Sequence, residues 1–246
     1  MVNVSQIKKR IKQKSSLLGA AIFGKSFDLI RGAIFLKIFS PSDFGLIDIV
    51  NQLISLSKYA DIGLLDNTKR EYNYNVIKQP IIAEQRKSAS YGYDLIITFI
   101  LFITLLSSSF FIKESYVVKV GVIFGSFSFL LTKLIKILKL DMTLTKNFKA
   151  YTELSITLTL VQNILILSTV SFIGIYAPLV IKSIALLIVF LYTLNKYPLK
   201  LKFKIEWHEL NHQIKYGIVF SGISILFGIW IFFERFIITK YFSLAE

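Results

Sequence analysis

Residues 91–112 read YGYDLIITFILFITLLSSSFFI, an almost uninterrupted run of aliphatic and aromatic side chains. About 20 such residues are enough for an α-helix to cross the roughly 30 Å hydrocarbon layer of a membrane. Similar stretches recur along the whole chain, so the sequence predicts an all-α fold, a polytopic transmembrane helical bundle of about seven spans. The predicted spans are residues 17–39, 44–65, 91–112, 117–138, 154–173, 179–194 and 216–242.

The composition also favours a membrane protein. The chain has 246 residues, of which 54% are hydrophobic and 15% aromatic, and its mean hydropathy is +0.62. A soluble domain of this length cannot bury so much apolar surface, whereas a bilayer can cover it. The net charge of +14 does not indicate nucleic-acid binding, because the basic residues lie between the apolar runs. The chain has no cysteine, so disulfide and thiolate chemistry are excluded.

The positions of lysine and arginine predict the orientation of the spans. Basic residues are concentrated in the amino-terminal arm, residues 1–15, and in the connections 66–90, 139–149 and 195–213. These are alternate connections, and basic connections favour the cytoplasmic side. We therefore expect the amino terminus in the cytoplasm and the carboxyl terminus on the other side. The stretch after the arm contains charges and no small-residue cleavage site, which favours a retained helix over a signal peptide.

Polar side chains inside the predicted spans are the candidate functional residues, because a charge within the membrane needs a partner or a water-filled cavity. In the first span the charges recur every three residues, and in the second the polar residues are three to four apart, as on one helix face. The last span carries an acidic–basic pair. The candidate cavity residues are Lys25, Asp28, Arg31, Asp48, Asn51, Gln52, Ser55, Lys58, Glu234 and Arg235.

These residues allow two interpretations. In the first, the two polar faces form a hydrophilic cavity whose lysines and arginine attract a phosphate or pyrophosphate group. In the second, Asp28 neutralises Lys25 or Arg31 and the bundle is held together without a ligand. The pair in the last span is open to the same two interpretations. Three further lysines, Lys133, Lys136 and Lys139, are expected to extend to the headgroups and contact anionic lipid.

Residues 208–212 read HELNH, which fits the H-E-x-x-H pattern of zinc peptidases. The chain has only these two histidines, so a third ligand would have to be a carboxylate such as Glu234. The segment is also amphipathic and begins at Trp207, which favours a helix lying on the cytoplasmic membrane surface. We therefore predict no catalytic residues, no metal and no cofactor, with an intramembrane zinc peptidase as a remote alternative.

Two segments resemble a known family. Residues 33–64 read AIFLKIFSPSDFGLIDIVNQLISLSKYADIGL. They are similar to the helix 1–helix 2 signature of polysaccharide-biosynthesis flippases, in which a proline-containing turn and an aromatic–glycine pair open helix 2 and an Asp-x-Gly closes it. The matching residues here are Pro41, Phe44, Gly45, Asp61 and Gly63.

The second segment is residues 214–235, IKYGIVFSGISILFGIWIFFER. It resembles the start of that family's second half, where a Tyr-Gly precedes helix 7. The family usually ends this helix with Asp-Arg, and Glu234-Arg235 stands in the corresponding place.

The resemblance is to the O-antigen and capsule flippase branch of the multidrug/oligosaccharidyl-lipid/polysaccharide exporter superfamily. Members have twelve to fourteen helices in two lobes around a central cavity. They move undecaprenyl-pyrophosphate-linked oligosaccharides from the cytoplasmic to the outer leaflet. The resemblance implies that Lys25, Arg31 and Lys58 line the passage, and it implies a location in the bacterial cytoplasmic (inner) membrane.

By the same resemblance, residues 16–194 form a six-helix amino-terminal lobe, and residues 195–246 form a cytoplasmic loop and the helix that starts a missing second lobe. We therefore expect contacts with membrane lipids, a lipid-linked oligosaccharide substrate and a possible partner that supplies the second lobe. Within the same fold the alternative is a multidrug or lipid-linked peptidoglycan-precursor exporter. A non-transporting membrane interaction protein is a third class. The polar faces of the first two spans argue against it, because a passive scaffold has little reason to keep them.

Overall fold

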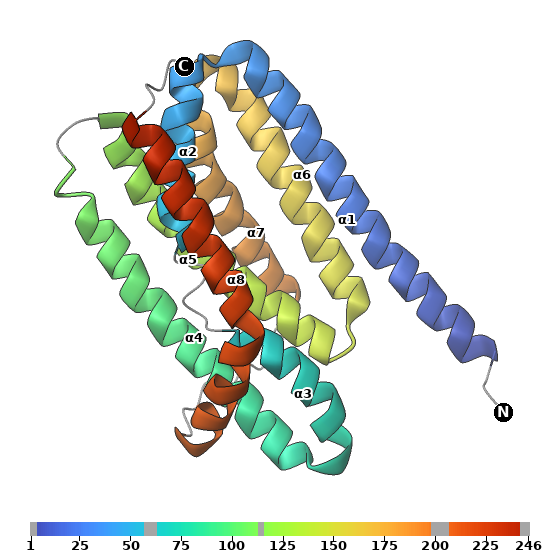
Figure 1. Cartoon of the computed structure of the whole chain (residues 1–246). Helices are drawn as coiled ribbons and strands as arrows, with labels where there is room; N and C mark the ends of the chain where they lie inside the picture. Colours follow the sequence, from blue (N-terminus) through green and yellow to red (C-terminus); the bar gives the residue numbers. More distant parts are fainter. Residues whose placement is uncertain (1–3, 57–62, 113–115, 198–206, 242–246) are drawn as a thin grey trace.

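The computed structural model describes residues 4–56, 63–112, 116–197 and 207–241, and the regular elements in these ranges are all helical (Figure 1). This confirms the all-α prediction for the described part of the chain. The elements are α1 (Val4–Ile38), α2 (Pro41–Leu56), α3 (Leu64–Lys78), α4 (Pro80–Ser108), α5 (Tyr116–Leu144), α6 (Phe148–Ile173), the π-helical turn η2 (Ala177–Ile181), α7 (Lys182–Lys196) and α8 (Trp207–Tyr241).

Four helical segments are long and apolar enough to cross a membrane: α4, α5, α6 and the continuous segment Ala177–Lys196 formed by η2 and α7. They coincide with four of the predicted spans, which confirms the coarser prediction of a helical membrane protein. Of the other three predicted spans, two fall within α1 and α8, each 35 residues long, and the third begins in the 16-residue α2. The count of seven spans stays a prediction.

Helix α5 lies at the centre of the bundle, where it contacts α2, α3, α4, α6 and α7 (Figure 1). Its contact with α2 is close because Gly121 has no side chain: a Cβ atom at this position would lie 2.7 Å from Cγ2 of Val50. On its other side, α5 packs against α6 and α7 through an aliphatic core. The buried members of that core are Leu131, Ile135, Leu138, Met142, Ala150, Leu154, Leu186 and Val189.

Helix α1 runs alongside α6, away from the centre (Figure 1). Phe35 of α1 and Phe39, the residue directly after this helix, pack with Ile166 and Val170 of α6, and these four side chains are buried together. Most of the rest of the described part of α1 is exposed or half-buried. The aromatic pair therefore fixes the distance between the carboxyl-terminal halves of the two helices.

The connection 66–90, predicted as a basic loop, is helical instead. It consists of α3, the single residue Gln79 and the first turns of α4, which form a tight helical hairpin. Pro80 begins α4 in the position where a proline's missing N–H costs no hydrogen bond. Helix α3 buries one face, in which Leu65, Thr68 and Tyr72 follow at helical spacing. The prediction was wrong because hydropathy alone does not register a helix whose buried face is partly polar.

The segment before the last predicted span also differs from expectation. Instead of a separate surface helix, α8 is continuous from Trp207 to Tyr241, and its first turns pack against α3 and α4. Leu210 and Gln213 are buried in this contact. The buried side of the amphipathic pattern therefore packs against α3 and α4, while Trp207 is exposed.

Candidate functional site

The predicted polar faces of the first two spans meet in a pocket of about 310 Å³ between α1, α2, α6 and the η2–α7 segment. Four predicted residues line it: Asp28 and Arg31 from α1, and Asp48 and Asn51 from α2. Two further polar residues, Gln162 of α6 and Lys182 of α7, complete the lining. Its apolar wall includes Phe35, Phe44, Ile47, Ile166 and Pro178.

The start of α2 explains how its polar residues are placed in this pocket. Ser40 and Asp43 form a capping box: the Ser40 backbone N–H donates to Asp43 Oδ2 at 3.0 Å, and the Asp43 N–H donates to Ser40 Oγ at 3.3 Å. Pro41 occupies the first helical position, for which its fixed φ is suited. With the first turn fixed, Asp48 and Asn51 lie on one face because three residues make nearly one turn.

The charges of the pocket are balanced rather than cationic. Arg31 Nη2 donates to Asp28 Oδ1 at 3.0 Å, with 22% and 48% of the two side chains exposed. The ion pair named in the second interpretation is therefore present, and it lies within α1. An exposed ion pair contributes about 1 kcal/mol or less, so it can open when a ligand offers better partners. Counting Asp48 and Lys182 as well, the lining carries two carboxylates and two cationic groups, which sum to zero.

The remaining predicted site residues do not line this pocket. Lys25 is exposed on α1, Ser55 is half-buried on α2, and Glu234 is exposed on α8. The side chains of Gln52 and Arg235 and the whole of Lys58 lie outside the described residues.

Two lining residues were missed although the sequence carried the signal for them. Lys182 and Gln162 lie inside predicted spans 179–194 and 154–173, where the rule applied to the first two spans also holds.

The same rule, that a charge within a span needs a partner or a cavity, also marks Asp94 in span 91–112. Asp94 Oδ1 lies 3.3 Å from Lys133 Nζ, and the two side chains are 1% and 5% exposed. The expectation that Lys133 extends to the headgroups is therefore wrong.

The HELNH segment forms a polar contact between helices. Glu209 Oε2 accepts a hydrogen bond from Arg86 Nε at 2.7 Å, and the same guanidinium donates from Nη1 to Glu71 Oε2 at 3.0 Å. Burial raises the pKa of Glu209, but the hydrogen bonds and charges of Arg86 and His208 outweigh it, so the net pKa is lowered. A carboxylate held in this way is a weak base for activating water.

The two histidines of this segment lie near different carboxylates. His208 is exposed, and His212 Nδ1 lies 3.9 Å from Glu71 Oε2. In the described part of the chain no three histidine, cysteine or carboxylate side chains are grouped so that they could hold a metal ion. The side chains of this segment therefore form a contact between α8 and the α3–α4 hairpin.

No family model matches this chain, and no match was found among curated proteins or solved structures. The pocket between α1, α2, α6 and α7 is therefore judged by its own chemistry. It offers carboxylate acceptors, guanidinium and ammonium donors, and two amides that both donate and accept. Such a lining suits a ligand with many hydroxyl groups better than a purely anionic one.

Proposed function

We propose that this protein is a transporter of the bacterial cytoplasmic membrane that moves undecaprenyl-pyrophosphate-linked oligosaccharide from the cytoplasmic to the outer leaflet. The observation that carries the proposal is a polar pocket built from residues of four segments, of which α6 and the η2–α7 segment are long and apolar enough to cross a membrane. A pocket lined by charged side chains in this setting is costly and has little use in a passive scaffold.

The pocket suits the sugar part of such a substrate. Each sugar hydroxyl both donates and accepts, so a lining with Asp28 and Asp48 as acceptors and Arg31 and Lys182 as donors can satisfy it. The volume of about 310 Å³ is at the lower end of the range for ligand pockets. The pocket would therefore hold part of the oligosaccharide while the polyprenyl tail stays in lipid.

The finer topology belongs to this proposal. Seven spans, a cytoplasmic amino terminus and an amino-terminal lobe at residues 16–194 agree with the charge distribution along the chain. In this arrangement the pocket would form one wall of the passage.

A multidrug exporter of the same fold is the second candidate, and one observation favours it. Asp28 and Asp48 place two carboxylates in a pocket with the aromatic side chains Phe35 and Phe44. Carboxylates with aromatic rings are the groups that bind organic cations. The two functions therefore differ in the substrate that is moved and in the charges on which transport depends.

The proposal is tested by reconstituting the full chain in liposomes with a fluorescent undecaprenyl-pyrophosphate oligosaccharide and measuring its exposure to a membrane-impermeant quencher. We expect flipping by the native chain and at least a roughly tenfold loss in Arg31→Ala and Lys182→Ala, because each removes a charge-assisted hydrogen bond. Lys37→Ala is the matched control, since Lys37 is exposed on α1 and does not line the pocket.

Three results would contradict the proposal: no flipping by the native chain, equal flipping by the pocket variants and the control, or transport of an organic cation in place of the oligosaccharide. In the last case Asp28→Asn and Asp48→Asn should abolish transport, which would establish the multidrug alternative.

A further inference from the structure

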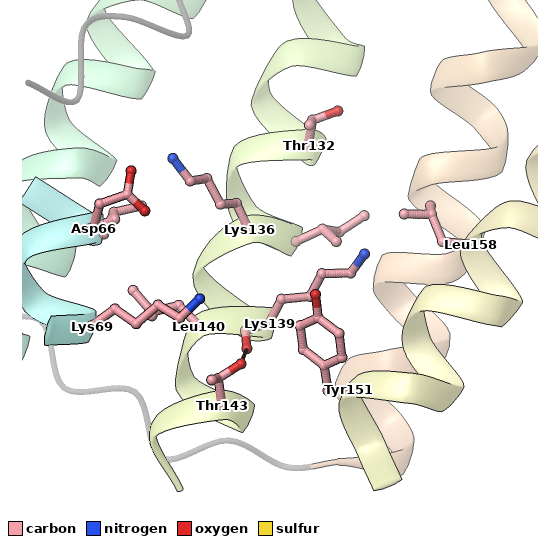
Figure 2. Close-up of a pocket in the computed structure, with 11 residues that line it drawn as sticks. Asp66, Lys69, Thr132, Lys136, Lys139, Leu140, Thr143, Tyr151 and Leu158 are labelled. Carbon is pink, nitrogen blue, oxygen red and sulfur yellow. Dashed lines mark hydrogen bonds between the residues drawn. The ribbon is translucent and has the colours of Figure 1, made fainter. Parts of the chain in front are cut away.

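A second pocket, of about 380 Å³, lies between α3, α5 and α6 (Figure 2). It shares no lining residue with the pocket described above. Three lysines line it: Lys69 from α3, and Lys136 and Lys139 from α5. Figure 2 shows Lys69 and Lys136 reaching across the space between α3 and α5, while Lys139 reaches toward α6.

The charge of this pocket is positive. Its lining contains three ammonium groups and one carboxylate, that of Asp66, which sum to +2. Like charges gathered beside a low-dielectric bundle repel one another more strongly than they do in water. An anion that enters the pocket relieves this repulsion, so the site favours a ligand with negative charge.

The other polar groups narrow the choice of ligand. The hydroxyl of Thr143 donates to the Lys139 backbone carbonyl at 2.8 Å, which leaves it only as an acceptor. The Nζ of Lys139 lies 5.7 Å from the centroid of the Tyr151 ring, a cation–π contact that holds this lysine at the wall of the pocket. The strong donors are thus the ammonium groups, which bind phosphate as point charges.

The position and the apolar lining point to an amphiphile. Lys139 and Thr143 lie in the last turns of α5, and Tyr151 lies in the first turn of α6, so the pocket lies near the ends of two membrane-length helices. Headgroups lie at this depth in a membrane. The lining also contains four aliphatic side chains, Leu65, Ile135, Leu140 and Leu158, along which an acyl chain can pack.

We infer that this pocket binds the phosphate headgroup of an anionic membrane phospholipid. The inference goes beyond a general attraction of lysines to the membrane surface, because it assigns the headgroup to one place where α3, α5 and α6 meet. It does not rest on the proposed transport activity.

The test measures lipid binding to the detergent-purified full chain by native mass spectrometry, with phosphatidylglycerol and, separately, the zwitterionic phosphatidylcholine. We expect at least tenfold tighter binding of phosphatidylglycerol, and a loss of about tenfold in Lys69→Ala and in Lys139→Ala, as for removal of one charge-assisted hydrogen bond. Lys149→Ala is the matched control, because Lys149 is exposed on α6 near the same end and does not line the pocket. Its phosphatidylglycerol affinity should stay within twofold.

The outcomes decide between headgroup binding and the other sources of the signal. If Lys149→Ala loses as much as Lys69→Ala, the binding is diffuse surface electrostatics and the pocket is refuted. If inorganic phosphate competes as well as phosphatidylglycerol, the ligand is a soluble anion and the lipid assignment is wrong. Lys69 is exposed, so replacing it by alanine leaves the core intact. An unchanged gel-filtration elution volume of this variant, measured with phosphatidylcholine present, would verify that it folds.

Discussion

Replacing Lys133 by methionine should destabilise the bundle more than any change at an exposed ion pair. Lys133 Nζ lies 3.3 Å from Asp94 Oδ1 between α5 and α4, and the side chains are 5% and 1% exposed. Breaking such a buried pair from one side costs about 3–5 kcal/mol, because the remaining charge stays desolvated. For a protein of this size about 1 kcal/mol corresponds to roughly 2–4 °C. We therefore expect the melting temperature to fall by roughly 6–20 °C.

The assay is the temperature at which detergent-purified protein loses its monodisperse gel-filtration peak. Two variants make the reasoning refutable. Arg31→Gln breaks the half-exposed pair with Asp28 and should lower the melting temperature only slightly, since exposed pairs contribute about 1 kcal/mol or less. The double change Lys133→Met with Asp94→Leu should restore most of the loss, because it removes both charges of the pair. Equal effects of Lys133→Met and Arg31→Gln, or no recovery in the double variant, would show that the pair is not the cause.

Two further changes test the helix contacts. Gly121→Ala should cost about 1–3 kcal/mol by overpacking, because Cγ2 of Val50 would lie 2.7 Å from the new Cβ. In the same melting assay, adding Val50→Ala should restore the stability, and Gly19→Ala, which has open space around it, should have a small effect. Arg86→Met should release the start of α8, seen as faster amide hydrogen exchange there. The pKa of Glu209 is lowered, so this carboxyl stabilises the native contact above its ordinary pKa of 4.5 and loses that contribution as the pH falls through its lower native value. Relative to the intrinsic exchange rate at each pH, the start of α8 should therefore lose protection in acid in the native chain but not in the variant.

Periodicity and the cost of intramembrane charge were sufficient to predict part of the site. Asp28, Arg31, Asp48 and Asn51 line one pocket, as their spacing on two helices indicated. What could not be read from that spacing is the charge balance, because it depends on Lys182, which α7 brings to the pocket through tertiary packing. From the first two helices the lining carries Asp28, Arg31 and Asp48, which sum to −1, and Lys182 brings the sum to zero. The cavity was expected to be cationic, but Lys25, one of the lysines behind that expectation, does not line it.

The fold was predictable where hydropathy is high and not where buried faces are polar. Helices α4 to α7 follow from long apolar runs. Helix α3 does not, because its buried face includes Asn67 and Thr68, which are satisfied by Gln213 at 2.7 Å and Ser90 at 2.7 Å. A hydrogen bond between residues so distant in sequence leaves no local signal, so this segment was predicted as a loop.

The π-helical turn η2 determines which way the whole of α7 faces. A π turn contains one residue more than an α turn, so a chain shortened by one residue between Ala177 and Ile181 could continue as regular α-helix. Each later side chain would then rotate by about 100° around the axis. Lys182 would swing out of the mixed-charge pocket, and Val189 would leave the aliphatic core. One inserted residue therefore sets the phase of an entire membrane helix.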